Sequence, residues 1–187
     1  MSRKIQLLSG IQYTLPLLLG IAPFGMIYGV LAVKAGFPPT AAQAMSAVIF
    51  AGSSQFMIVN LVAGGSPWPV VVLTAVVVNL RHALYSASLA PFLKHLSAGW
   101  KALLAYVLVD EAYAVGIHHY EENGAARNSH WFLLGSGLAV WMCWQVSTAL
   151  GIFLGAQIPA EWSLDFTLAL TFIAIVVPGL KDRPLLI

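Results

Sequence analysis

Two pairs of ionisable residues lie in the middle of long apolar stretches, where a charged side chain is costly. Arg81 and His82 fall halfway along the apolar run 69–93, and Asp110 and Glu111 fall in the middle of the next run. An arginine at the centre of a membrane-length helix costs at least ~3 kcal/mol on insertion scales, so it must face a water-filled cavity or a buried partner. We expect the basic pair and the acidic pair to be partners and to mark a functional site.

The expected depths of the two pairs agree with this pairing. Arg81 lies about 13 residues before the short connection 94–99 and Asp110 about 10 residues after it, so at 1.5 Å per residue their depths differ by about 5 Å. A short connection predicts antiparallel neighbouring helices, with Tyr106, Asp110 and Tyr113 on one stripe. A purely structural ion pair is the alternative, but charges inside a membrane favour function.

The composition places these residues in a membrane protein. The chain has 187 residues, of which 59% are hydrophobic and only 9% charged, and its mean hydropathy is +0.84. Soluble domains carry about 25% charged residues. The net charge of +2 comes without a basic patch for nucleic acid, and the single Cys143 excludes an internal disulfide and a thiolate metal cage. We expect no cofactor and no metal, and without a GxxxxGK[ST] motif ATP does not drive this chain directly.

Apolar runs recur along the whole chain, each near the ~20 residues needed to cross the hydrocarbon. Their approximate bounds are 12–33, 40–63, 69–93, 100–120, 131–157 and 164–180. The connections are too short to separate domains. We therefore predict one all-α domain over residues 1–187: a polytopic membrane helix bundle with about six transmembrane segments, one or two of them broken or re-entrant.

The second run carries an unusual polar sequence at its centre, Gly52-Ser53-Ser54-Gln55. Hydroxyl and amide groups satisfy the backbone groups that a helix break frees. Transporters use such breaks to point the free N–H groups of a half-helix at an anionic part of the substrate. The alternative is a continuous helix whose serines bond to the preceding turn; we favour the broken or re-entrant form.

The first run contains a second candidate interruption at Pro23-Phe24-Gly25, because proline removes a backbone donor. This segment either breaks the helix and contacts the substrate, or forms a kinked helix in which Gly25 and Gly29 provide a small packing face.

Polar residues of the third and fifth runs fall on defined helix faces. In the third run they form two adjoining faces, with Asn79, His82 and Ser86 on one and Arg81, Tyr85 and Ser88 on the other. In the fifth run, hydrogen bonds across helices are expected from Gln145, Ser147 and Thr148.

The distribution of Lys and Arg gives the orientation. With six full crossings, five of these residues lie on the side of the N-terminus and three on the opposite side, which favours a cytoplasmic N-terminus. If the second run is re-entrant, the count becomes four against four and gives no preference.

Several motifs occur together in the order and spacing of one known family. They are Pro23-Phe24-Gly25, Met45-Ser46, Phe50-Ala51-Gly52-Ser53-Ser54-Gln55-Phe56, Asn79-Leu80-Arg81-His82-x-Leu-Tyr85 and Asp110-Glu111-x-Tyr113. From about Gly20 to Arg183 the chain resembles the AzlC-type branched-chain amino-acid permease family. The resemblance implies export of branched-chain amino acids across the cell inner membrane, with a small AzlD-type membrane protein as the partner. Such proteins continue with further hydrophobic segments, so we expect a form that is short or truncated at its C-terminus.

A zwitterionic amino acid requires three kinds of group, and the sequence supplies each. Its carboxylate is expected at the N–H and hydroxyl groups of 52–54 or at Arg81, and its ammonium at Asp110 or Glu111. One of these acids or His82 carries a coupling proton. The substrate-binding set is Pro23, Gly25, Gly52, Ser53, Ser54, Gln55, Asn79, Arg81 and Tyr85. The apolar walls suit leucine, isoleucine, valine and methionine.

Two other classes of function use the same residues. Ser53 or Ser54, His82 and Asp110 supply the residue types of an intramembrane serine hydrolase, but Gly-Ser-Ser-Gln lacks a strained nucleophile elbow. A non-transporting scaffold or channel subunit is the other alternative, and the charges at mid-membrane argue against a pure scaffold. We therefore expect a transporter and not an enzyme.

Overall fold

The computed structural model describes residues 2–124, 126 and 128–157, and every regular element in this part of the chain is a helix. In order, the helices are α1 (Arg3–Lys34), α2 (Pro39–Val48), α3 (Gly52–Ala63), α4 (Trp68–Leu93), α5 (Ala98–Tyr106), α6 (Asp110–Asn123) and α7 (His130–Gly155). The predicted all-α class is confirmed. The sixth apolar run, 164–180, lies outside the described residues.

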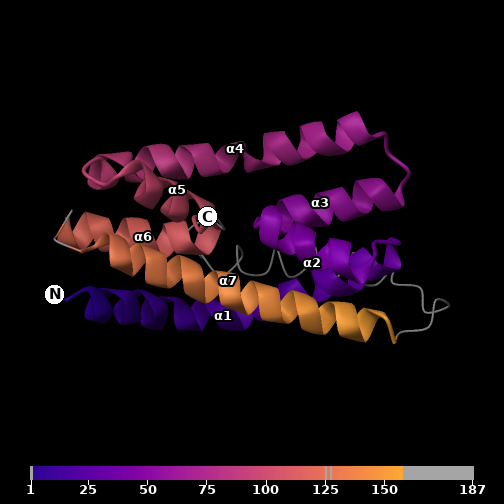
Figure 1. Ribbon diagram of the computed structural model, residues 1–187, viewed down its shortest axis with the longest axis horizontal. Helices are drawn as coiled ribbons and strands as arrows, with labels where there is room; N and C mark the ends of the chain where they lie inside the picture. The colour runs from indigo at the N-terminus through magenta and orange to yellow at the C-terminus, as the bar shows by residue number, and fades with distance from the viewer. Residues whose placement is uncertain (1, 125, 127, 158–187) are drawn as a thin grey trace, which may run out of the picture.

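Three helices, α1, α4 and α7, are long and apolar enough to cross a membrane. Helices α1 and α7 lie side by side (Figure 1) and run in the same direction, because Gly10 lies against Phe132 whereas Gly29 lies against Gly151. Helix α4 runs in the opposite direction: Leu89, near its end, packs in one apolar cluster with residues from the start of α7. The described chain therefore crosses between the two ends of the bundle three times.

Glycines allow the backbones of α1 and α7 to touch. A Cβ atom at Gly10 would lie 2.1 Å from the carbonyl oxygen of Phe132, and one at Gly151 would lie 2.1 Å from that of Met26. We call this contact the glycine seam; its glycines are Gly10, Gly25, Gly29, Gly135, Gly151 and Gly155. Such small residues permit close helix packing where lipid provides no hydrophobic drive.

The predicted break at Pro23-Phe24-Gly25 is wrong, because α1 continues through both Pro16 and Pro23. Membrane helices tolerate proline where neighbouring helices support the backbone. The alternative, in which Gly25 belongs to a small packing face, is confirmed: a Cβ atom at Gly25 would lie 2.7 Å from the Cβ atom of Ser147 on α7.

Helices α2 and α3 form a re-entrant hairpin, which we call the first hairpin. The interruption between them falls at residues 49–51, directly before Gly52, so the predicted break in the second run is confirmed. There the amide of Ala51 bonds only to the carbonyl of Ile49, and regular bonding resumes from Gln55 to Ala51. Helix α3 then returns alongside the first half of α4 to the end of the bundle where α2 began (Figure 1).

Helices α5 and α6 form the second hairpin, which enters from the opposite end (Figure 1). The fourth run is broken at residues 107–109, so the expected single stripe of Tyr106, Asp110 and Tyr113 is wrong. The sequence also predicted that the helix following α4 runs antiparallel to it. For α6 this is wrong, because α6 runs in the same direction as α4. This direction follows from contacts in matching order: Arg81 with Asp110, Tyr85 with Tyr113, and Phe92 with Tyr120.

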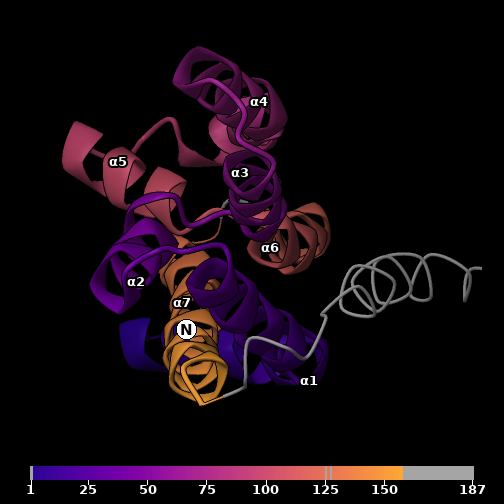
Figure 2. The ribbon, with the colours of Figure 1, turned by 90° about the vertical axis from the view of Figure 1, so that its right-hand side faces the viewer.

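The tips of the two hairpins meet in the middle of the bundle, while α4 lies across them on the side away from α1 and α7 (Figures 1 and 2). The Tyr106 hydroxyl, at the end of α5, donates a hydrogen bond to the carbonyl of Ala47 in the first hairpin, at 2.7 Å. Its ring lies 6.2 Å from that of Phe50, centroid to centroid. This meeting point is where the polar residues singled out in the sequence collect.

Candidate functional site

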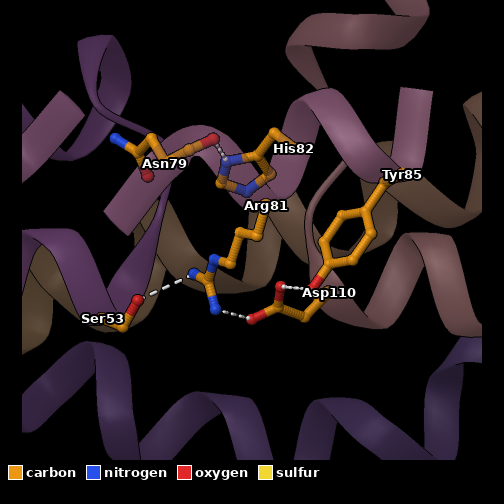
Figure 3. A network of polar contacts seen from close by, with 6 residues as sticks. All are labelled: Ser53, Asn79, Arg81, His82, Tyr85 and Asp110. Atoms are coloured by element: carbon orange, nitrogen blue, oxygen red, sulfur yellow. Dashed lines mark hydrogen bonds and ion pairs between the residues drawn. The ribbon is translucent and has the colours of Figure 1, made fainter. Parts of the chain in front are cut away.

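Arg81 on α4 connects the two hairpins at their tips. Its Nη1 lies 2.6 Å from Oδ2 of Asp110 in the second hairpin, and its Nη2 donates to the hydroxyl of Ser53 in the first, at 2.8 Å (Figure 3). The expected ion pair is therefore present, although it is reached by a different chain path. The two side chains are 29% and 43% exposed, so the pair borders open space and is not sealed in a core.

The carboxylate of Asp110 has a second partner on α4. Tyr85 donates its hydroxyl hydrogen to Oδ1 at 2.8 Å (Figure 3), so both carboxylate oxygens are hydrogen-bonded. The ring of Tyr85 stacks on Tyr113 with 4.3 Å between centroids, and Tyr113 in turn donates to Ser88. Charge-assisted bonds of this kind are stronger than neutral ones, so α4 and α6 are fixed in register beside the pair.

Each hairpin presents the N-terminus of a half-helix to this centre. Helix α3 begins with Gly52, Ser53 and Ser54, whose N–H groups have no helical acceptors, and α6 begins with Asp110 and Glu111. The N-terminal end of a helix carries about half a positive charge. Together with the guanidinium group, two such ends make this centre suitable for an anionic group, which Asp110 only partly satisfies.

Helix α7 supports the start of α3 through Trp144. The Trp144 indole N–H donates to Oε1 of the fully buried Gln55 at 3.0 Å. A Cβ atom at Gly52 would lie 2.8 Å from Cη2 of Trp144, so glycine is what lets the ring pack against the first turn. From the sequence, Trp144 is expected to pack against neighbouring helices and is not among the predicted site residues; its place next to the polar residues of the fifth run was the available signal.

Polar residues of α7 also hold α2 in place. Gln43 donates to Oε1 of Gln145 at 2.7 Å, Gln145 donates to the carbonyl of Ser46 at 3.1 Å, and the hydroxyls of Ser46 and Thr148 are 3.1 Å apart. The hydrogen bonds across helices expected from Gln145 and Thr148 are therefore confirmed. They fix α2, the first helix of the first hairpin, to α7.

A cavity of about 240 Å³ lies between the hairpin tips and α4; we call it the tip cavity. Its lining combines apolar and polar groups: Val48, Ile49, Phe50, Ala51, Asn79, His82, Ala105, Tyr106 and Leu108. The hydroxyl of Tyr106 accepts a hydrogen bond from the indole of Trp141 at 2.8 Å and so fixes one wall. The mixture of apolar and polar lining groups is that of a small-molecule site, although the cavity is smaller than the roughly 300–1,000 Å³ of typical ligand pockets.

Most of the predicted site residues converge here. Ser54 accepts from the amide nitrogen of Asn79 at 3.2 Å, and Glu111 is the partly buried second residue of α6. Pro23 and Gly25 do not join the cluster, since the proline is exposed and the glycine lies in the glycine seam. Sequence analysis missed Tyr106 as a wall of the cavity, because its position depends on the unexpected break after it.

Ser53, His82 and Asp110 have the residue types of a serine hydrolase triad, but they are not joined by the serine–histidine–aspartate hydrogen bonds of such a triad. The Ser53 hydroxyl bonds to Arg81, and His82 Nδ1 lies 3.2 Å from the backbone carbonyl of Asn79. Within the described residues, no group of three or more His, Cys, Asp or Glu side chains is placed to hold a metal ion.

The fold and the polar centre define a multi-pass helical membrane protein built around two opposed re-entrant hairpins. A family model described as AzlC protein matches residues 16–158, and the chain belongs to this family.

Three relatives illustrate its range. The chain is 29% identical over 182 residues to the inner membrane protein YgaZ of Escherichia coli (strain K12), covering 94% of this chain and 74% of the relative. An uncharacterized membrane protein of Archaeoglobus fulgidus is 30% identical over 187 residues, covering 98% and 80%. The branched-chain amino acid transport protein AzlC of Bacillus subtilis (strain 168) is 30% identical over 173 residues, covering 90% and 66%. No solved structure matches the chain.

Proposed function

We propose that this protein is a secondary transporter that exports branched-chain amino acids across the cell inner membrane. The observation that carries the proposal is Arg81, which links the N-termini of α3 and α6 beside the tip cavity. Transporters bind substrates near the membrane midplane, where half-helix N-termini face anionic groups. The printed name of the Bacillus subtilis relative supports the same class of substrate.

In this proposal the substrate carboxylate binds at the first turn of α3, to the free N–H groups of 52–54, within reach of the Arg81 guanidinium. Ile49, Phe50 and Leu108 form apolar walls for the aliphatic side chain. Glu111, in the first turn of α6, carries the coupling proton. The proton is assigned to Glu111 and not to Asp110 because Asp110 already accepts hydrogen bonds from Arg81 and Tyr85.

The opposed hairpins support a mechanism of alternating access. The segments α2–α3–α4 and α5–α6–α7 are each a re-entrant hairpin followed by a long helix, and the two long helices run in opposite directions (Figure 1). Inverted arrangements of this kind place the binding site at their interface. We propose that each hairpin closes the site toward its own side of the membrane, with a small AzlD-type subunit as partner, as the family resemblance implies.

We also propose that the N-terminus is cytoplasmic. With both hairpins re-entrant, Arg3, Lys4, Lys94 and Lys101 lie at one end of the described bundle, and Lys34 lies at the other. Cytoplasmic connections carry the excess of Lys and Arg. Four against one supports this orientation better than the count expected from six full crossings.

Counterflow of labelled leucine into proteoliposomes, with and without the small subunit, tests the transport proposal. Aliphatic burial contributes about 0.8 kcal/mol per methylene, and one methylene separates substrates only ~10–200-fold. Leucine, isoleucine, valine and methionine should therefore compete with one another. Glycine and alanine should compete poorly, and lysine and glutamate should not compete, because each places an unpaired charge in an apolar pocket. Equal inhibition by lysine and leucine would contradict the proposal.

A further inference from the structure

Two hydrogen-bond acceptors at the tip cavity are left without a partner. They are Nε2 of His82 and Oδ1 of Asn79, which belong to two residues that line the cavity. Both atoms are buried, and neither has a hydrogen-bond partner among the described residues. Leaving a buried polar atom unpaired costs about 1–3 kcal/mol. Two such atoms at one cavity indicate that a ligand completes them.

The neighbours of His82 determine which of its nitrogens accepts. Nδ1 lies 3.2 Å from the backbone carbonyl oxygen of Asn79 (Figure 3). A carbonyl oxygen only accepts, so Nδ1 carries the hydrogen of this bond. In a neutral imidazole the other nitrogen then has a free lone pair, and Nε2 is an acceptor.

The side chain of Asn79 also leaves an acceptor without a partner. Its Nδ2 donates to the hydroxyl of Ser54 at 3.2 Å, which leaves Oδ1 as the unpaired atom. Both unpaired atoms are thus acceptors on one turn of α4, and the kind of group suited to them is a donor with several hydrogens.

The carboxylate expected to fill this role is engaged elsewhere. Oδ2 of Asp110 holds Arg81 at 2.6 Å and Oδ1 accepts from Tyr85 at 2.8 Å, so the carboxylate has a cation and a hydroxyl already. An ammonium group bound at Asp110 would share the carboxylate with the Arg81 guanidinium of α4, so acceptors that have no partner suit it better.

We propose that Nε2 of His82 and Oδ1 of Asn79 bind the α-ammonium group of the transported amino acid. This assignment rests on the proposed function and specifies its ligand: a primary ammonium with three N–H donors, held by neutral acceptors. The carboxylate of the same molecule then extends toward the start of α3, where Ser54 joins Asn79 to the half-helix. Neutral acceptors hold the ammonium group without cancelling its charge. No ion pair between the protein and this group therefore has to break when the amino acid is released.

The test measures binding of leucine and of 4-methylpentanoate, which has the same side chain and carboxylate but no ammonium group. The full chain is used in lipid nanodiscs, with the wild type compared with Asn79→Leu and His82→Phe. Leucine binding should weaken at least about tenfold in each variant, the value of one hydrogen bond to a charged group, while 4-methylpentanoate binding stays constant. Asn79→Asp retains the acceptor and should restore leucine binding.

Asn123→Leu is the matched control, because it removes an amide that donates to the carbonyl of His119 at the end of α6 away from the cavity. It should change neither ligand. If both variants weaken leucine and 4-methylpentanoate equally, or leave leucine unchanged, the ammonium assignment is wrong while the proposed function stands. If the wild type binds neither ligand, the proposed function itself fails and the assignment with it.

Discussion

At the scale of single residues, the centre of this protein depends on the shape of the Arg81 side chain. A guanidinium group presents several N–H donors in a fixed planar fork, and here separate nitrogens reach Asp110 and Ser53 on different hairpins. A lysine ammonium is a single point charge and does not span both partners with the same geometry. The residue is therefore a connector between elements as well as a charge.

Substitution of Arg81 or Asp110 by alanine should show that the two residues are coupled. Each single change leaves an uncompensated charge and should lower stability, with loss of leucine transport. The cost should be smaller than the ~3–5 kcal/mol of a fully buried pair, because Asp110 is 43% exposed and solvent screens part of its charge. The double variant should cost less than the sum of the two single variants. Thermal stability in detergent and counterflow are the measurements, and Ser88→Ala, which removes a hydrogen bond between the same two helices without touching either charge, is the control. Strict additivity would show that the contact has no energetic role.

The pairing of Arg81 with Asp110 could be predicted from sequence because charges inside a membrane need partners. Ser53 and Ser54 were also found, since a glycine followed by polar residues is conspicuous in an apolar run. Trp144 and Tyr106 could not be found in this way. Their hydrogen bonds go to Gln55 and to the backbone of Ala47, and these groups are within reach only after the hairpins have formed.

At the scale of elements, the two hairpins differ in how visible their breaks are in the sequence. The first break precedes Gly52, a residue that weakens a helix. The second falls in Val-Leu-Val at 107–109, which contains neither glycine nor proline. The broken segment packs against α7, where Gly137 leaves room for Val107: a Cβ atom there would lie 2.6 Å from Cγ2 of the valine. Contacts with a distant helix cannot be read from the run itself.

The glycine seam should be sensitive to a single added methyl group. A Cβ atom at Gly29 would lie 2.4 Å from the carbonyl oxygen of Thr148, which is backbone and cannot move aside. Gly29→Ala should therefore separate α1 from α7 and lower the free energy of unfolding by about 1–3 kcal/mol, the usual cost of overpacking. Gly20→Ala in the same helix is the matched control, because nothing lies within 4 Å of its added Cβ. Thermal melting should distinguish the two variants, and equal melting temperatures would contradict the packing account.

At the scale of the whole molecule, the hairpins change which end of the bundle each connection occupies. Six full crossings place the connections around Ser66 and Ser97 on the cytoplasmic side and on the outside, respectively. Within the described residues, three crossings with two re-entrant hairpins reverse both positions. The described Lys and Arg residues at the two ends of the bundle, Arg81 at its centre left aside, then divide four to one. The number of apolar runs could be counted from sequence, but whether a run crosses or returns depends on contacts between runs.

Cysteine labelling in intact cells should distinguish these two topologies. In a Cys143→Ala background, Ser66→Cys should react with a membrane-impermeant maleimide, and Ser97→Cys should react only after the cells are permeabilised. Both serines lie in connections between helices, and the exchange of oxygen for sulfur is small. The opposite pattern of labelling would establish full crossings and reject the re-entrant hairpins.

The first hairpin has a consequence for biogenesis. Its tip residues Ser54 and Ser53 pair with Asn79 and Arg81, which are synthesised 25 and 28 residues later respectively, and Gln55 pairs with Trp144, 89 residues later. Until those partners emerge, the unpaired N–H groups at the start of α3 cost several kcal/mol each in hydrocarbon. The nascent hairpin must therefore wait at the aqueous interface or inside the insertion machinery while α4 and α7 are made. The candidate site is therefore completed only after α4 and α7 have been made, so a ribosome stalled before α7 should leave α2–α3 accessible to proteases.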